Sequence, residues 1–180
     1  MTLDLRRYTH ANAAEARPLL VRLYGDVYTG DPVRDDDAFA QRLAGQTASP
    51  GWVGVIEYRD GEPVAYAYGM PLPADTDWWT RTAPHLPVDD DLVREDGART
   101  FTLAEIGVRA AWRGTGLARR LHDVLLHDRP EERVVLRVLT ARPRLIATYR
   151  AWGYEAAPGV PDDAKVRAMI RPTESRPDAE

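Results

Sequence analysis

The residues best suited to chemistry lie in one continuous run, Thr102–Leu121, which reads Thr-Leu-Ala-Glu-Ile-Gly-Val-Arg-Ala-Ala-Trp-Arg-Gly-Thr-Gly-Leu-Ala-Arg-Arg-Leu. An apolar strand pattern leads into a turn rich in Arg and Gly, and a helical pattern follows. Gly114 and Gly116 allow the backbone to approach a ligand closely. The amides that open the helix, together with the helix dipole, favour a negative charge at this place. With the cationic Arg113 beside them, they predict a cradle for a phosphate or pyrophosphate group.

The spacing of these residues does not match two widespread phosphate motifs. A dinucleotide fingerprint needs a third Gly where Arg119 stands, and a P-loop needs Gly-Lys followed by Ser or Thr, which the chain lacks. The pattern that is present is Arg113-x-x-Gly116-x-Ala118. Neither of the two motif families is therefore indicated.

At these residues the chain resembles the GNAT superfamily of acyl-CoA-dependent N-acetyltransferases. Their signature, Arg/Gln-x-x-Gly-x-Gly/Ala, follows an apolar strand that ends in Val, as Val108 does here. A second segment, Thr148–Tyr154, resembles the family's later Tyr-x-x-x-Gly-Phe/Tyr pattern. Two motifs in the right order are more specific than either alone. The resemblance covers roughly residues 100–157.

The resemblance implies roles for particular positions. Acetyl-CoA would be the co-substrate, with its pantetheine arm paired to the backbone of a strand end and its pyrophosphate held by backbone amides. The strand end comprises Ile106, Gly107 and Val108, and the amides belong to Arg113, Gly114, Thr115, Gly116, Leu117 and Ala118. Tyr149 would donate a proton to the departing thiolate, and Glu105 would be the general base, directly or through water. No metal is implied.

The chain departs from the family pattern at two places. Ala110 stands where the family often has Pro, two residues after the strand-ending Val. Thr140 and Arg142 stand where the family often has Asn before the later helix. The second departure bears on the cofactor contact at that end.

Simpler structural roles stay open for the two candidate catalytic side chains. Tyr149 shares a helical face with Leu145 and Trp152, which is also typical of a core tyrosine. Glu105 could be an ion-paired strand carboxylate. Among the histidines, His122 is expected on the polar, solvated side of its helix, and His85 is a spare candidate base.

Composition narrows the chemistry further. The chain has no Cys, and Ser occurs only at Ser49 and Ser175. These counts exclude a disulfide framework, a thiolate metal site and a cysteine nucleophile, and they leave almost no room for a serine enzyme. Direct acetyl transfer to an amine suits this composition, because it needs no enzyme nucleophile. The strong preference for Arg over Lys indicates a GC-rich, bacterial genome.

The net charge of −4 hides an imbalance between the halves of the chain. Residues 1–96 carry 9 Arg and 17 Asp or Glu, a net charge of −8; residues 97–180 carry 15 Arg or Lys and 11 acids, a net charge of +4. The basic half holds the phosphate motif, and the acidic half suits a cationic amine. The leading hypothesis is acetylation of a primary amine of a small cationic molecule. The alternatives are acetylation of a protein N-terminus or lysine, and a non-catalytic acyl-CoA-binding module.

Hydrophobic periodicity predicts the elements that position these residues. Helices are expected at 11–28 with a kink or start near Pro18, at 36–46, at 114–127 and at 143–152, with a short one at Trp78-Trp79. Strands are expected at 3–8, 52–58, 64–70, 100–108, 134–139, 154–157 and 165–170, with a hairpin turn at Asp60-Gly61. The fold class is α/β (α+β), a GNAT-like mixed and mostly antiparallel sheet of about six or seven strands with helices on both faces and a parallel pair in its second half.

The organisation expected is a single domain over residues 1–171. A long insertion or lid occupies 71–98, and a disordered tail follows at 172–180. No signal peptide or membrane span is indicated, so a cytoplasmic location is expected. The expected partner is a small-molecule amine, with no nucleic acid and no membrane, and a homodimer is left open.

Overall fold

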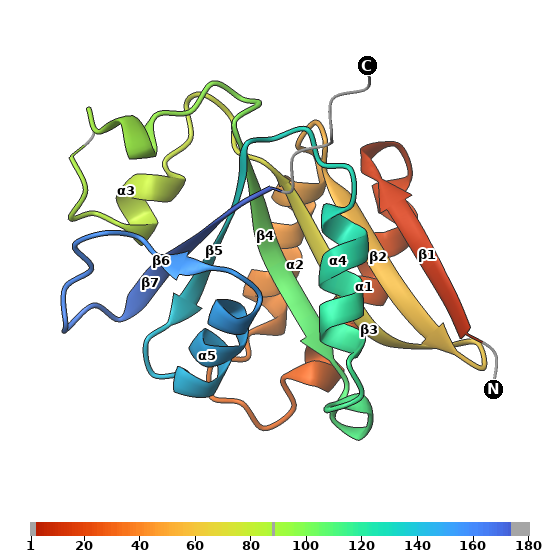
Figure 1. The fold of residues 1–180 in the computed structure, drawn as a ribbon. Coiled ribbons are helices and arrows are strands. Elements are labelled where there is room, and N and C mark those ends of the chain that lie inside the picture. Colours follow the sequence, from red (N-terminus) through yellow and green to blue (C-terminus); the bar gives the residue numbers. More distant parts are fainter. Residues whose placement is uncertain (1–2, 88, 174–180) are drawn as a thin grey trace, which may run out of the picture. The chain divides into compact units, whose positions relative to one another are not determined.

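The computed structural model describes residues 3–87 and 89–173, and Figure 1 shows its fold. The strands are β1 (Leu3–Thr9), β2 (Val53–Arg59), β3 (Glu62–Pro71), β4 (Thr100–Val108), β5 (Arg133–Leu139), β6 (Glu155–Ala156) and β7 (Val166–Pro172). The helices are α1 (Ala13–Val27), α2 (Asp36–Thr47), α3 (Trp78–Thr82), α4 (Leu117–Leu126) and α5 (Pro143–Ala151), with short 3₁₀ turns at η1 (His10–Asn12), η2 (Asp91–Val93) and η3 (Ala110–Trp112).

The strands form one mixed sheet in the order β1-β2-β3-β4-β5-β7-β6. β4 and β5 run parallel, with Phe101 opposite Val134. The neighbouring pairs β1–β2, β2–β3, β5–β7 and β6–β7 are antiparallel. The predicted α/β class, the mostly antiparallel seven-stranded sheet and its parallel pair are therefore confirmed.

The contacts divide the chain into two compact units. The first comprises Met1–Met70 and Leu103–His127, and the second comprises Pro71–Thr102 and Asp128–Glu180. Each unit has its own cluster of buried apolar side chains. That residues 1–171 form a single domain stays a prediction.

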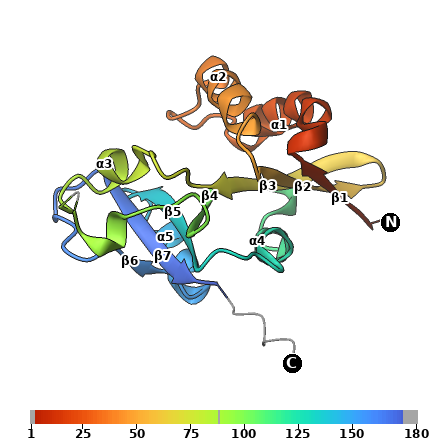
Figure 2. The ribbon, with the colours of Figure 1, turned by 90° about the horizontal axis from the view of Figure 1, so that it is seen from above.

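In the first unit, α1 and α2 cover one face of strands β1–β3 and α4 covers the other (Figure 2). The hairpin between β2 and β3 turns at Asp60 and Gly61, whose φ values are 49° and 85°. Positive φ at both central residues gives the tight turn that suits strand twist, so the predicted Asp-Gly hairpin is confirmed. Against the expected boundary, α1 begins at Ala13, after the turn η1, and continues through Pro18.

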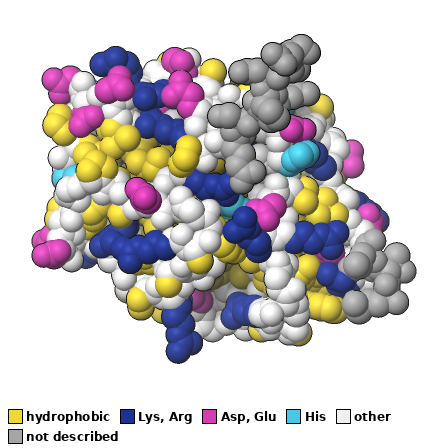
Figure 3. All heavy atoms as spheres, viewed as in Figure 1, with side chains coloured by type: hydrophobic (Ala, Val, Ile, Leu, Met, Phe, Trp, Pro, Cys, Tyr) yellow, Lys and Arg dark blue, Asp and Glu magenta, His cyan; other side chains and the backbone are white. Residues whose placement is uncertain are grey.

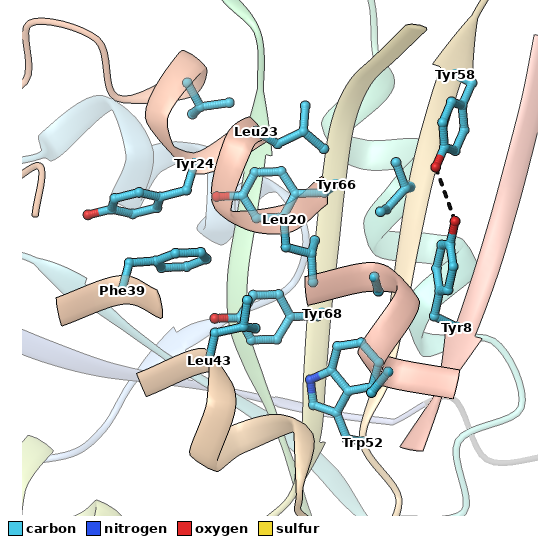
Figure 4. Packing of buried hydrophobic residues seen from close by; sticks show 14 residues of the cluster. Tyr8, Leu20, Leu23, Tyr24, Phe39, Leu43, Trp52, Tyr58, Tyr66 and Tyr68 are labelled. Carbon is cyan, nitrogen blue, oxygen red and sulfur yellow. Dashed lines mark hydrogen bonds between the residues drawn. The ribbon is translucent and has the colours of Figure 1, made fainter. Parts of the chain in front are cut away.

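Aromatic side chains dominate the core between α1, α2 and the sheet (Figure 4). Tyr24 and Phe39 stack with ring centroids 4.0 Å apart, and Tyr66 and Tyr68 of β3 lie nearly parallel at 6.5 Å. On the sheet side, the hydroxyls of Tyr8 and Tyr58 share a hydrogen bond of 3.1 Å. Figure 4 shows the hydroxyls of Tyr24, Tyr66 and Tyr68 pointing to the same side of the cluster.

In the second unit, α3 packs on β7, and a smaller apolar cluster forms around it. Trp79 of α3 is buried there together with Val135 and Ala168. Figure 2 shows α3 and α5 on opposite sides of β5 and β7. Trp79 thus belongs to a local core of the second unit.

The tail that was expected from residue 172 falls partly outside the described residues. Pro172 pairs with Arg133 in the sheet, and the Thr173 amide donates to the Glu132 carbonyl at 3.0 Å. These two residues belong to the folded part of the chain. Residues 174–180 lie outside the described residues.

Candidate active site

Strand β4 carries the candidate base. The Glu105 side chain is 13% exposed, and its Oε2 lies 3.7 Å from Nη2 of Arg42 on α2. The hydroxyl of Tyr28, which caps the C-terminus of α1, donates to Oε1 of Glu105 at 2.7 Å. A carboxylate with one oxygen close to a hydroxyl and the other close to a guanidinium is held in one orientation. The predicted strand carboxylate is therefore both ion-paired and positioned, a combination that keeps both of its proposed roles open.

Gly107 allows the sheet to pack closely behind this carboxylate. A Cβ at this position would lie 2.7 Å from Cε1 of Tyr66 and 3.1 Å from Cγ1 of Val27. Real Cβ atoms essentially never show a contact of 2.7 Å, so the tyrosine ring occupies the space that any larger residue would need. The glycine is thus required by packing at the point where the strand was expected to face a cofactor.

Arg113 is exposed, and its guanidinium binds two backbone carbonyl groups of the protein. Its Nε donates to the carbonyl of Val108 at 3.1 Å, and its Nη2 donates to the carbonyl of Val27 at 2.7 Å. The Arg113 amide also donates to the carbonyl of Ala110, at 3.3 Å. The motif arginine therefore ties the turn to the end of β4 and to the end of α1. It serves here as a positioning residue more directly than as a free cation.

The turn that follows has the backbone shape expected of a cradle. Gly114 and Gly116 adopt φ values of 77° and 83°, a left-handed conformation that favours glycine. A Cβ at either position would meet no atom within 4 Å, so open space, and not packing, surrounds them. The hydroxyl of Thr115 donates to the Trp112 carbonyl at 2.6 Å and holds the turn closed.

The backbone amides of residues 114–118 find no protein acceptor among the residues that the structure describes. They belong to the turn and to the first turn of α4, where helix amides ordinarily lack partners. The helix starts at Leu117, later than the expected 114, because Gly116 caps it in the left-handed conformation. The start of α4 thus presents several N–H groups that a phosphate oxygen could satisfy.

The body of α4 packs through Leu117, Leu121 and Leu125, which are buried as predicted. The prediction for His122 is wrong: its side chain is fully buried, with Nδ1 3.0 Å from Oδ1 of Asp123. The polar neighbours of His122 along the helix suggested solvent exposure, but its ring turns inward and contacts that carboxylate.

Further polar contacts join α4 to the sheet. Nη1 of Arg120 donates to Oε1 of Glu57 at 3.2 Å, and Arg59 lies 3.3 Å from the same oxygen. The Glu57 side chain is fully buried. The sequence alone did not single out this carboxylate, because it lies within an otherwise apolar strand pattern.

The sequence also gave no sign of the two buried tyrosines of β3, Tyr66 and Tyr68, whose pKa values respond to the Glu105 charge. Tyr66 is fully buried, and its hydroxyl has no partner within the described residues. Burial raises the pKa of Tyr66 well above its usual value, and the nearby Glu105 charge adds to this effect. Burial likewise raises the pKa of Tyr68, whose hydroxyl donates to Oε1 of Gln46 at 3.0 Å. These two hydroxyls therefore stay protonated and uncharged at neutral pH.

Tyr149, the candidate proton donor, belongs to the second unit. It is buried on α5, and its ring lies edge-on to Trp152 at 5.6 Å and to Tyr154 at 5.8 Å. The later motif therefore forms an aromatic group that fixes the ring of its first tyrosine. Thr140, at the departure from the family pattern, donates its hydroxyl to the Ala164 carbonyl at 2.7 Å.

The connection at 71–98 is anchored by a buried polar network. Oε1 of Glu95 accepts from Nε1 of Trp79 at 2.8 Å, from the hydroxyl of Thr100 at 2.8 Å and from Nη2 of Arg133 at 2.9 Å. The spare candidate base His85 has its Nε2 2.9 Å from the Pro158 carbonyl. The segment expected as an insertion or lid is thus joined to β4 and β5 through side chains.

No metal cluster marks another site in the described part of the chain. Groups of three or more His, Cys, Asp or Glu that could hold a metal are absent among residues 3–87 and 89–173. On the face drawn in Figure 3, arginine side chains lie among acidic and hydrophobic ones. Within the same residues, no helix is long and apolar enough to cross a membrane.

The comparisons identify the family. A family model described as "Acetyltransferase (GNAT) family" matches residues 14–154, which is most of the chain. The chain therefore belongs to the GNAT acetyltransferase family, whose members use acetyl-CoA, and it is a GNAT N-acetyltransferase. Among curated proteins, no match is found. The resemblance seen in the sequence is confirmed.

Solved structures share the fold. A putative GNAT acetyltransferase from Desulfovibrio desulfuricans has a TM-score of 0.67 at 15% identity and covers 96% of this chain and 100% of that one. The ribosomal-protein-S18-alanine N-acetyltransferase from Escherichia coli has a TM-score of 0.61 at 14% identity, covering 98% and 97%. The putative acetyltransferase yncA from Salmonella typhimurium, crystallised with acetyl-CoA, has a TM-score of 0.55 at 15% identity, covering 100% and 99%. At these identities the likeness concerns the fold.

Proposed function

We propose that this chain transfers an acetyl group from acetyl-CoA directly to a primary amine of a small molecule. The observation that carries the proposal is the turn before α4. Positive-φ glycines occupy the family's signature pattern there, and among residues 3–87 and 89–173 the amides of 114–118 meet no protein acceptor. Family membership supplies the reaction class, and the residues of this turn suit the co-substrate.

The pyrophosphate of acetyl-CoA is held by the amides of residues 114–118. These amides point out of a helix start whose dipole favours negative charge. Of the signature residues, Arg113 contributes by its side-chain bonds to Val108 and Val27, which keep the turn in place. The backbone of residues 106–108 pairs with the pantetheine arm and brings the thioester to the end of β4.

The chemistry requires one bond to form and one to break. The amine loses a proton to Glu105, directly or through water, and its nitrogen attacks the thioester carbon. A backbone amide near Val108 stabilises the resulting oxyanion. The C–S bond then breaks, and Tyr149 gives its proton to the departing CoA thiolate. The second proton that the nitrogen loses as the amide forms returns through water to Tyr149. The products are an N-acetyl amide and CoA, and no enzyme nucleophile takes part.

A screen of acetyl-CoA consumption over a panel of amines, paired with calorimetry of acetyl-CoA binding, tests the proposal. Turnover with small amines supports it. Turnover only with peptides would indicate a protein acetyltransferase, and binding without any turnover would indicate an acyl-CoA-binding module. Failure of acetyl-CoA to bind would overturn the cradle itself.

A matched pair of glycine variants isolates the cradle. Gly116 and Gly61 both have positive φ, and a methyl group added at either would enter open space. Replacing either by Ala strains the backbone by about 1–2 kcal/mol. Gly116→Ala should also weaken acetyl-CoA binding by about tenfold or more, since hydrogen bonds to a charged group are disturbed, whereas Gly61→Ala should leave it unchanged. Equal affinities in the two variants would contradict the assignment.

A further inference from the structure

The charges next to the candidate base are balanced and not simply negative. Glu105 lies half-buried on β4, and the guanidinium of Arg42 lies 3.7 Å from its Oε2. The Arg42 side chain is 48% exposed and the Glu105 side chain is 13% exposed, so the arginine is the more accessible member of the pair. A simple cationic amine that approached Glu105 would therefore meet a positive charge beside it.

The separation of the pair shows that Glu105 does not hold the Arg42 guanidinium in a tight ion pair. Tight charge-assisted hydrogen bonds between guanidinium and carboxylate have N···O distances of about 2.7–2.9 Å. The Arg42–Glu105 distance of 3.7 Å exceeds this range, while Tyr28 makes the close bond to the same carboxylate at 2.7 Å. Arg42 also interacts with the nearby Tyr68 hydroxyl, and the remaining N–H donors of its planar guanidinium suit a second carboxylate, the group it binds best.

Other carboxylates of this unit are engaged elsewhere. Asp26 pairs with Arg109, Asp36 accepts from Nε of Arg34 at 2.8 Å, and Asp35 caps α2 by accepting from the Ala38 amide at 2.9 Å. These three acidic residues of the first half of the sequence are therefore bound to other groups of the protein.

Aromatic rings border the pair. The guanidinium of Arg42 lies 5.4 Å from the ring centroid of Phe39, which stacks on Tyr24. Tyr24 in turn lies 4.7 Å from Tyr28. A planar guanidinium above an aromatic ring is held in a defined plane with little loss of its hydrogen-bonding capacity.

From these contacts we propose that the acceptor is an amino-acid-like molecule, with its amine at Glu105 and its carboxylate at Arg42. The inference rests on the proposed acetyl transfer and narrows its acceptor to amines that carry a carboxylate close by. The ammonium replaces the Arg42 charge at Glu105, and the acceptor carboxylate replaces the Glu105 charge at Arg42. Both protein charges stay neutralised while the acceptor is bound, which a simple amine cannot achieve.

Matched acceptors test the proposal. The panel comprises phenylalanine and leucine, the amides of both, and the decarboxylated amines phenethylamine and isoamylamine. With saturating acetyl-CoA, the free amino acids should have kcat/KM values about 10- to 100-fold higher than their counterparts, the range expected of one hydrogen bond to a charged group. Equal values across the panel, or a preference for the decarboxylated amines, would overturn the proposal.

The Arg42→Gln variant assigns the preference to one side chain. It should raise KM for the amino acids and lower KM for the decarboxylated amines, because a positive charge beside Glu105 is removed, and Arg42→Lys should restore part of the difference. Arg22→Gln is the control, because Arg22 makes an exposed ion pair on the same unit at 3.2 Å from Glu62. Equal losses by Arg42→Gln on all acceptors would indicate a structural role and contradict the inference.

A binding measurement separates this inference from the proposed function. In the presence of CoA, phenylalanine and leucine should raise the Tm of the wild type more than their amides do, and Arg42→Gln should abolish the difference. A carboxylate-dependent Tm shift without turnover would sustain the binding site and overturn acetyl transfer. Turnover of amines with no carboxylate dependence would sustain acetyl transfer and overturn this inference.

Discussion

The Tyr28 hydroxyl donates a hydrogen bond of 2.7 Å to Oε1 of Glu105, across 77 positions of sequence. Tyr28 is the C-cap of α1, and Glu105 lies in the second half of β4. The bond therefore joins the end of a covering helix to the strand that carries the candidate base. It fixes one carboxylate oxygen and leaves the other beside Arg42, 3.7 Å away. A substitution at Glu105 that keeps an acceptor for the Tyr28 hydroxyl can therefore test the role of the carboxylate while the fold is retained.

Glu105→Gln should lower kcat/KM by about 10²- to 10⁴-fold with an amine accepted by the wild type, the range expected on losing a general base. The amide oxygen of Gln can still accept from Tyr28, so the melting temperature and acetyl-CoA affinity should stay close to those of the wild type. Initial rates over a range of pH, with calorimetry of acetyl-CoA binding, provide the measurements. An unchanged pH–rate profile would remove Glu105 as the base.

Tyr149→Phe tests the proposed proton donor. The variant keeps the ring that packs against Trp152 and Tyr154, and it deletes only the hydroxyl. We expect kcat to fall by about 10²-fold or more, since a general acid is lost, while acetyl-CoA affinity is nearly retained. Single-turnover rates and calorimetry distinguish the two effects. Equal losses of turnover and affinity would point to a structural role for this tyrosine.

Gly107→Ala should destabilise the protein through overpacking. The added Cβ would lie 2.7 Å from the Tyr66 ring, and overpacking of this kind costs about 1–3 kcal/mol. Gly45→Ala is the control, because Gly45 lies within α2 with no atom within 4 Å of a Cβ. That change should stabilise the helix by about 0.5–1 kcal/mol. Guanidinium unfolding curves give the free energy of unfolding of both variants. Similar values for Gly107→Ala and Gly45→Ala would show that the Tyr66 ring moves aside at little cost.

Much of the fold could be predicted because periodicity is local. β4 spans Thr100–Val108, the range that the apolar pattern indicates, and the Asp60-Gly61 hairpin follows from backbone preferences alone. The glycine turn before α4 could be predicted for the same reason, since its glycines and the helix start are contiguous in sequence. The helix was expected from residue 114, but α4 begins at Leu117. The difference arises because Gly116 has the left-handed conformation of a cap and lies outside the helix.

The contacts that were missed are those between distant residues. Tyr28 and Arg42 reach Glu105 from two helices, and no spacing in the sequence encodes that meeting. The burial of His122 likewise depends on what packs against α4, while its sequence neighbours Asp123 and Arg120 are polar. Side-chain roles that depend on such long-range contacts become visible only when the strands and helices are placed.

Acid stability should depend on Asp123. Partial burial raises the pKa of Asp123, but hydrogen bonds from Arg119 and His122 outweigh burial and hold it below its usual value. A lowered carboxyl pKa contributes stability above the unfolded value of about 3.9, and that contribution is lost as the pH falls below it. Asp123→Asn should therefore be destabilised at neutral pH and show a flatter loss of stability in acid. Equal acid sensitivity of the two proteins would contradict this role.

Glu57 should contribute far more to the free energy of unfolding than Glu62, an exposed carboxylate of the same hairpin. Its side chain is fully buried and accepts from Arg120 at 3.2 Å, while Arg59, only 11% exposed, lies at 3.3 Å. Removing one partner of a buried ion pair leaves a charge unpaired and costs about 3–5 kcal/mol. Because Arg120 is partly exposed, we expect Glu57→Gln to fall at the lower end, about 3 kcal/mol.

The matched control is Glu62→Gln. Glu62 pairs with Arg22 at 3.2 Å, but both side chains are more than half exposed, and such pairs contribute about 0–1 kcal/mol. Guanidinium unfolding of both variants, with acetyl-CoA binding measured alongside, compares the two carboxylates. If the Arg120–Glu57 hydrogen bond fixes the position of α4, Glu57→Gln should lower acetyl-CoA affinity more than Glu62→Gln does. Equal stabilities would show that the buried charges find other partners when Glu57 is neutralised.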